Sequence, residues 1–352
     1  MGTIVTQAYK AIENIVGSRY ISDDPAIMQG YKSGPGGYEA GLGYERVMTV
    51  LPAAVALPKD ADELQRIVKI CARYNVPYVP YATGFYGPKT HCHVDDELII
   101  DMKRMQYFNW DEKHMFADIG PGIIYSSLQQ EAFNKGCYGV IGGGGAQCSA
   151  IANLLGDGWS PISLKIGLPH RRILGTELVL PDGELVKMGS LATSDDPFWG
   201  EGPGPDLRGI LRGFTGLRGC MGTVTRMAVK YLPLIQDCPK PQGVAPNTSL
   251  ALDERRIRWI NFQVPTKANQ VQAMYEIGAA EICAACTKVP VFWRAIAKAE
   301  DKEEFWDIWL KESEESLKNF HLVRVLVVGY ANEEQMDYEL AVLDDIFEKQ
   351  ED

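Results

Sequence analysis

The sequence predicts an α+β protein in which a larger domain of alternating strands and helices precedes a smaller α+β domain. Three observations carry this prediction: a strand–helix–strand unit at residues 55–81, a β-hairpin at residues 173–189, and a change of composition after a proline-rich segment at residues 235–252. Beyond that segment the chain holds four of its seven tryptophans and two predicted acidic helices. Such a change is typical of a domain boundary, and 352 residues can form two substantial cores.

The helix of the first unit is predicted from its ends and its apolar spacing. Asp60 or Asp62 can cap its N-terminus, and Asn75 can end it in a left-handed turn. A short strand starting at Val76 follows. Between the caps, one buried stripe is predicted from the apolar residues at helical spacing: Leu64, Ile67, Val68, Cys71 and Ala72.

The turn after that strand, residues 82–87, is built from small residues that leave backbone N–H groups accessible, and such a turn can bind a phosphate. Glycine clusters recur beside later strands, and glycine allows a backbone to approach a ligand closely. Their number favours a ligand lined by backbone over ordinary turns. A nucleotide cofactor is therefore the first hypothesis, although the sequence has no Rossmann or P-loop motif. The later clusters lie at residues 120–122, 142–145, 156–158 and 219–222.

The remaining elements are predicted from hydrophobic patterns. The hairpin at 173–189 turns at Pro181-Asp182-Gly183, and residues 235–252 are interpreted as a linker. In the first domain, further strands are expected at 98–102, 116–119 and 224–231, with a helix from 124 to about 136. In the second domain, we expect strands at 257–263 and 322–329 and helices at 267–285, 292–318 and 332–349.

Composition excludes several classes of function. The chain has 35 basic and 46 acidic residues, and this net charge of −11 disfavours nucleic acid and anionic membranes as partners. No apolar run is long enough to span a membrane and no signal-peptide pattern is present, so we expect a cytoplasmic protein with reduced cysteines.

Two cysteine motifs carry weak signals. His91-Cys92-His93 is interpreted as a surface loop rather than a flavin tether or a metal site, because zinc needs four ligands and no second cluster is spaced to help. The pair Cys283 and Cys286 lies near the end of a predicted helix, where structural thiols are favoured over redox chemistry. No metal site is expected.

Six segments of the chain occur in the order of one flavoprotein family. They are VALPKDADELQRIVKICARYNVPYVPYATG, LIIDMKRM, ADIGPG, SAIAN, ILGTELVLPDGELV and CMGTVTRMAVKYLP. Together they resemble the FAD-binding PCMH-type domain of the vanillyl-alcohol oxidase and para-cresol methylhydroxylase superfamily. The resemblance implies an N-terminal segment at 1–54, an FAD-binding domain of two α/β subdomains at 55–240, and an incomplete cap domain at 241–352.

This resemblance implies FAD as the cofactor and gives particular residues a role. Tyr86 matches a tyrosine that contacts the substrate phenol oxygen in phenol-oxidising members, and a packed loop tyrosine is the alternative. The pyrophosphate would be held by backbone groups of Ala82, Thr83, Gly84, Phe85, Tyr86 and Gly87. Close approach to the cofactor is implied for Pro121, Gly122, Gly142, Gly143, Gly144, Gly145, Ser149, Ala150, Asn153, Gly158, Gly222, Thr223 and Val224.

The implied function is a dehydrogenase subunit that transfers a hydride from a small organic substrate to flavin N5. A phenolic or alkyl-bearing aromatic is the first substrate class; a 2-hydroxy acid of the glycolate or lactate type is the second, and a non-catalytic scaffold is the third hypothesis. Family members continue past the position of Asp352 through the rest of the cap. We therefore expect a hetero-oligomer in which a partner subunit completes the cap and accepts electrons, with iron–sulfur centres as one route.

Overall fold

A computed structural model describes residues 4–31, 51–84, 94, 96–139, 145–155, 160–189, 191–194, 221–237, 240–244, 247–288, 291–319 and 321–350. The chain divides into two compact units: the first comprises Met1–Gly158 and Pro169–Pro233, and the second comprises Trp159–Leu168 and Leu234–Asp352. Both units combine helices and strands, which confirms the predicted α+β class. The sequence-based boundaries at residues 54 and 240 stay predictions.

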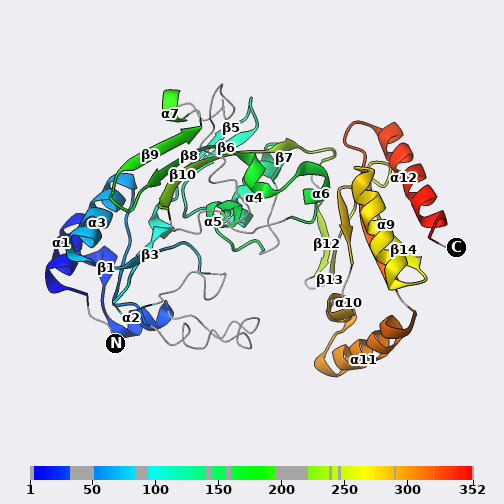
Figure 1. Cartoon of the computed structure of the whole chain (residues 1–352), viewed down its shortest axis with the longest axis horizontal. Helices are drawn as coiled ribbons and strands as arrows, with labels where there is room; N and C mark the ends of the chain where they lie inside the picture. The colour runs from blue at the N-terminus through cyan, green and yellow to red at the C-terminus, as the bar shows by residue number, and fades with distance from the viewer. Residues whose placement is uncertain are drawn as a thin grey trace. The chain divides into compact units, whose positions relative to one another are not determined.

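The first unit begins with a four-stranded sheet in the order β1-β2-β4-β3, in which β2, β4 and β3 run parallel. Helices α1 and α3 cover one face of this sheet, while Met28 of α2 packs on the other face (Figure 1). The strands are β1 (Ile21–Ser22), β2 (Ala54–Ala56), β3 (Tyr78–Tyr81) and β4 (Leu98–Asp101); the helices are α1 (Thr6–Val16), α2 (Pro25–Gly30) and α3 (Ala61–Tyr74).

Local signals determine α3. The Asp60 carboxylate accepts a hydrogen bond from the Glu63 backbone N–H, which caps the helix, and Asn75 ends it at φ 52° in the left-handed region. Four of the five predicted stripe residues are buried, but Ala72 is exposed. It lies one position past Cys71, about 100° around the helix and beyond the arc that faces the sheet.

A second sheet in the same unit is antiparallel, in the order β5-β6-β10-β8-β9. Helices α4 and α5 pack against one face of it and enclose a second core, which includes Leu128 and Met227 (Figure 1). The predicted hairpin is confirmed as β8–β9, with Gly183 of its turn at φ 83°. Its elements are β5 (Phe108–Asp111), β6 (Phe116–Ile119), β8 (Ile173–Val179), β9 (Leu185–Gly189), β10 (Thr223–Lys230), α4 (Tyr125–Asn134) and α5 (Ala150–Leu155).

The second unit is built on a three-stranded sheet in the order β14-β16-β15, with α9 and α12 packed on one face. The Phe262 and Phe347 rings stack there with centroids 3.7 Å apart. Its elements are β12 (Pro241–Val244), β13 (Asn247–Leu250), β14 (Ile257–Val264), α9 (Lys267–Ala279), β15 (Ala285–Thr287), α10 (Val291–Lys298), α11 (Lys302–Asn319), β16 (His321–Val328) and α12 (Glu333–Glu348). Shorter elements are β7 (Cys137–Tyr138), β11 (Leu232–Pro233), α6 (Ser163–Ile166), α7 (Leu191–Ser194) and 3₁₀ turns at Ser18–Tyr20, Met102–Arg104 and Pro169–Arg172.

Two predictions for this unit are wrong. The helix expected at 267–285 ends at Ala279, so Cys286 lies in β15 and Cys283 precedes it at φ 66°. Pairing of β15 with β16 outweighs the local helical pattern here. The segment at 235–252, interpreted as a linker, contains the β12–β13 hairpin. Within the described residues, no helix is long and apolar enough to cross a membrane.

Candidate cofactor site

The predicted phosphate turn begins at the carboxyl edge of the parallel strands. Tyr81, the last residue of β3, pairs in register with Asp101, the last residue of β4. Ala82 and Thr83 leave this edge, and Gly84 adopts φ 65°, which favours glycine. Ligands of open parallel sheets bind at this kind of edge. Phe85, Tyr86 and Gly87 lie outside the described residues.

A polar cluster stands beside the start of that turn. The fully buried Asp101 carboxylate accepts hydrogen bonds from the Tyr31 hydroxyl at 2.7 Å and from the Lys103 backbone N–H at 3.0 Å, and it pairs with the Lys103 ammonium at 2.7 Å. The Tyr31 and Tyr81 rings meet edge to face with centroids 5.3 Å apart. Burial, reinforced by Asp101, raises the pKa of Tyr31 to about 12.

That pKa gives a testable dependence on pH. Because the folded protein holds the Tyr31 proton more tightly than the unfolded chain does, its stabilising contribution is complete below pH 10 and is lost as the pH rises towards about 12. Urea unfolding of the wild type and of Tyr31→Phe, compared across this range, should show their difference in unfolding free energy shrinking as the pH rises. Exposed Tyr275→Phe is the control, and a difference independent of pH would contradict the assignment.

A second group of predicted residues forms around the turn at 120–122. The backbone N–H of Gly122 donates to the Met105 carbonyl at 3.0 Å, and that of Gly120 donates to the Tyr107 carbonyl at 2.8 Å. A Cβ added at Gly122 would lie 2.9 Å from the Lys103 carbonyl oxygen, so only glycine fits this close approach. The turn therefore lies directly against the segment that follows β4.

The same turn contacts the N-terminus of α5. The Ser149 hydroxyl donates to the Pro121 carbonyl at 3.1 Å, and the Ala150 backbone N–H donates to the Ile123 carbonyl at 3.0 Å. The Asn153 backbone N–H donates a hydrogen bond to the Ser149 carbonyl at 3.1 Å, within the first turn of α5. The structure thus brings together four predicted residues: Pro121, Gly122, Ser149 and Ala150.

The other predicted residues in the described part of the chain are not hydrogen-bonded to the turn at 120–122. Gly145, at φ 100°, precedes the α5 segment. Gly222, at φ 152°, leads into β10, where Thr223 pairs with Val179 and Val224 packs into the core. The contacts of the described residues do not join this strand end to the turn at Gly122. Gly142, Gly143, Gly144 and Gly158 lie outside the described residues.

Two buried polar atoms in the predicted set fit an absent ligand. Among the described residues, Asn153 Oδ1 and Thr223 Oγ1 have no hydrogen-bond partner, although Asn153 is only 9% exposed and Thr223 only 3% exposed. A buried polar atom without a partner costs about 1–3 kcal/mol, so such atoms are often satisfied by a ligand or water. These two oxygens are therefore compatible with a bound polar cofactor, but the feature is not specific to the predicted set, because Trp110 Nε1 and Thr176 Oγ1 also lack a partner within the described part of the chain.

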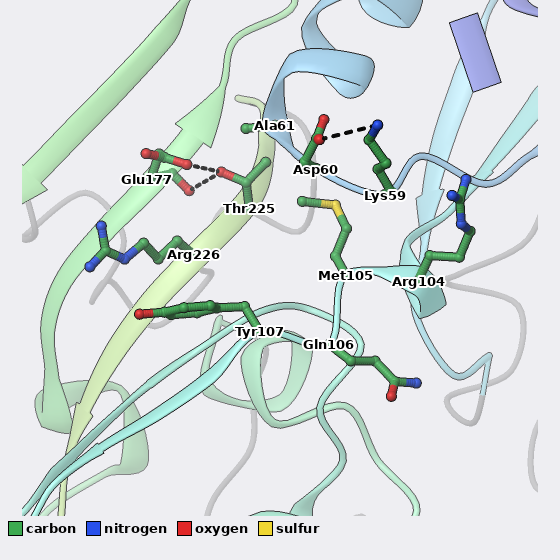
Figure 2. Close-up of a pocket in the computed structure, with 10 residues that line it drawn as sticks. All are labelled: Lys59, Asp60, Ala61, Arg104, Met105, Gln106, Tyr107, Glu177, Thr225 and Arg226. Carbon is green, nitrogen blue, oxygen red and sulfur yellow. Dashed lines mark hydrogen bonds and ion pairs between the residues drawn. The ribbon is translucent and has the colours of Figure 1, made fainter.

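A cavity of about 520 Å³ lies in the same unit, and none of its lining residues belongs to the predicted set. Figure 2 shows that the residues lining it come from the N-terminus of α3, the segment after β4, and strands β8 and β10. Its wall adjoins the turn at 120–122, because the carbonyls of Met105 and Tyr107 accept hydrogen bonds from the backbone N–H groups of Gly122 and Gly120. The lining residues are Lys59, Asp60, Ala61, Arg104, Met105, Gln106, Tyr107, Glu177, Thr225 and Arg226.

Charged groups of this cavity are held in fixed pairs. The Arg226 Nε donates to both carboxylate oxygens of the buried Asp118, at 2.8 and 3.0 Å. The Thr225 hydroxyl donates to the Glu177 carboxylate at 2.8 Å, as Figure 2 shows. Sequence reasoning missed them, although a charged residue inside each of two apolar strands was a usable signal. Among the described residues, no cluster of His, Cys, Asp and Glu could hold a metal ion. His91, Cys92 and His93 lie outside them.

Comparison with known proteins gives three findings. Residues 52–189 match the family described as FAD binding domain. Glycolate oxidase subunit GlcD of Bacillus subtilis is 29% identical over 185 residues, which are 52% of this chain and 37% of the relative. A mitochondrial D-lactate dehydrogenase [cytochrome] of Arabidopsis thaliana is 26% identical over 235 residues, 60% of this chain and 39% of the relative. The chain thus spans well under half of each curated relative.

Among solved structures, p-cresol methylhydroxylase with substrate bound superposes with a TM-score of 0.72 at 15% sequence identity. The match covers 98% of this chain and 65% of that one. At this identity the likeness concerns the fold, and it extends over both units.

Proposed function

We propose that this chain is an FAD-dependent dehydrogenase subunit acting on a small organic substrate, because residues 52–189 match the family described as FAD binding domain. One observation carries the proposal. Within the matched domain, the glycine turn at 121–122 is hydrogen-bonded to the N-terminus of α5. When bound, FAD supplies a two-electron acceptor that amino-acid side chains lack.

The protein's own contribution is binding and orientation of the cofactor. Backbone groups of Ala82, Thr83 and Gly84 at the β3 edge suit the pyrophosphate, because peptide N–H groups in a turn bind anions. Because Gly122 has no side chain, its turn packs closely against the carbonyls of Lys103 and Met105, and this contact fixes the position of the turn. Asn153 and Thr223 offer buried polar atoms to the rest of the cofactor. Tyr86 remains our candidate for orienting a phenolic substrate.

Two substrate classes are supported by different findings. The fold of p-cresol methylhydroxylase favours a phenolic or alkyl-bearing aromatic substrate. The relatives with higher identity are named glycolate oxidase and D-lactate dehydrogenase, and these names favour a 2-hydroxy acid. We place the aromatic class first and keep the 2-hydroxy acid as the second candidate.

Anaerobic reduction of the FAD-loaded chain separates these candidates. Bleaching of the flavin by 4-alkylphenols, slowed by Tyr86→Phe, is expected for the first class. Bleaching by glycolate or D-lactate, at a rate that Tyr86→Phe does not change, would instead support the 2-hydroxy acid class. A flavin that binds but is reduced by neither class would contradict the proposed catalysis and favour a scaffold.

We propose further that the chain works in a hetero-oligomer that passes the electrons on. The name of the Bacillus relative, a subunit, supports this. The native mass of the protein purified from its source tests it: a particle well above the 39.0 kDa chain mass that contains a second polypeptide is expected. An active particle containing this chain alone would overturn the proposal.

A further inference from the structure

We propose that Lys103 binds the pyrophosphate of FAD from the strand next to the phosphate turn, an inference that rests on the proposed cofactor. Asp101 and Tyr81 are register partners on adjacent parallel strands, which lie about 4.8 Å apart. The turn at 82–84 leaves one strand and Lys103 follows the other, at the same edge. Lys103 is thereby a neighbour of the turn in the fold, although about 20 residues separate them in sequence.

The side chains on this face connect the turn to the lysine. A Cβ at Gly84 would collide with the ring of Tyr81, so the turn folds back over that ring. Tyr81 meets Tyr31 edge to face, and the Lys103 ammonium donates to the Tyr31 hydroxyl at 3.2 Å. Turn, rings and ammonium thus form one continuous set of contacts.

The Lys103 ammonium is held in place yet keeps a donor for an anion. It has three N–H donors, and within the described part of the chain its acceptors are Asp101 at 2.7 Å and Tyr31 at 3.2 Å. About half of its side chain is exposed. Burial alone would lower the pKa of Lys103, but the hydrogen bond and charge of Asp101 raise it, so the ammonium stays protonated.

The backbone of Lys103 lies against the second cofactor turn. Its carbonyl oxygen is the atom that a Cβ at Gly122 would approach to 2.9 Å. Lys103 therefore lies near two groups of predicted cofactor residues. One is the turn at 82–84, after a strand of the first sheet, and the other is the turn at 120–122, after a strand of the second sheet. A pyrophosphate held by both groups would pass within reach of its side chain.

Other cations are less suitable. The turn at 82–87 contains no basic residue. Arg104, the next residue after Lys103, is directed elsewhere: its guanidinium donates to the Leu57 carbonyl at 2.6 Å and covers the Tyr20 ring at 3.5 Å from the centroid. Among these positions, Lys103 is the one whose ammonium contacts the Tyr31–Tyr81 ring pair beside the turn.

The test compares FAD and riboflavin, which lacks phosphate, by flavin fluorescence during titration of the apo-chain. Lys103→Gln should weaken FAD binding by about 10-fold to 100-fold and reduce its dependence on salt, because one charge-assisted hydrogen bond is lost. Riboflavin binding should not change, and Lys103→Arg should restore most of the FAD affinity. Lys135→Gln, which removes a comparably exposed lysine paired with Glu112, is the matched control.

Two results would overturn the proposal. One is unchanged FAD affinity in Lys103→Gln, and the other is an equal loss of affinity for FAD and riboflavin in that variant. A wild-type chain that binds no FAD would instead refute the proposed function itself, so the two failures are distinguishable.

Discussion

Replacement of Gly122 by alanine is expected to weaken FAD binding by roughly 100-fold. The added Cβ would lie 2.9 Å from the Lys103 carbonyl oxygen and 3.0 Å from the Met105 carbonyl oxygen, well inside the optimal separation of about 3.5–4.0 Å for nonbonded atoms. Both contacts are backbone atoms, so the turn itself must move. Overpacking of this kind costs about 1–3 kcal/mol, and movement of the turn also disturbs the Ser149 hydrogen bond to Pro121.

Titration with FAD measures the effect, and circular dichroism reports whether the fold survives. Gly30→Ala is the matched control, because no atom lies within 4 Å of the position of its added Cβ. The control should bind FAD like the wild type. Equal affinity in Gly122→Ala and the wild type would show that the turn at 121–122 does not contact the cofactor.

Replacement of Glu339 by alanine should cause the largest loss of stability in the second unit. This buried carboxylate pairs with Lys165 at 3.0 Å and accepts hydrogen bonds from Gln335 at 2.8 Å and from the Cys283 backbone N–H at 2.8 Å. The substitution leaves the buried Cys283 N–H without an acceptor and removes the carboxylate partner of the Lys165 ammonium, which keeps only the Glu281 carbonyl, at 3.2 Å, as an acceptor among the described residues. Breaking a buried pair in this way costs about 3–5 kcal/mol.

The measurement is urea unfolding followed by tryptophan fluorescence, because four of the seven tryptophans lie in the second unit after residue 252. Glu334→Ala is the control on the same helix, since Glu334 is exposed and its loss should change stability by no more than about 0.5 kcal/mol. If Glu339→Ala were no less stable than this control, the carboxylate would not be what holds the 160–168 segment to the second unit.

The fold was predictable wherever short-range signals agree with the tertiary contacts. Helix α3 followed from the Asp60 cap, the apolar spacing and the left-handed Asn75, all within one stretch of chain. The signals failed where a distant strand decides the outcome: β15 exists because it pairs with β16, about 40 residues later. A local helical pattern around Cys283 could not report that partner.

In the candidate site too, features set by neighbouring residues were predictable, and features set by distant residues were not. Backbone roles at Gly84 and Gly122 were accessible to sequence reasoning, because a glycine at a strand end indicates a turn or a close approach of the backbone. The cluster of Tyr31, Asp101 and Lys103 was not, since its hydrogen bonds join residues about 70 positions apart. The Arg226–Asp118 pair spans 108 positions and was missed for the same reason.

The central claim is that this chain binds FAD through the 52–189 domain. The most direct measurement is the visible absorption spectrum of the purified chain after incubation with FAD and removal of free flavin. We predict about one flavin for each chain, from the single matched domain, and weaker flavin bands for Gly122→Ala than for the wild type at the same FAD concentration. A colourless protein that takes up no FAD under any reconstitution condition would contradict the account.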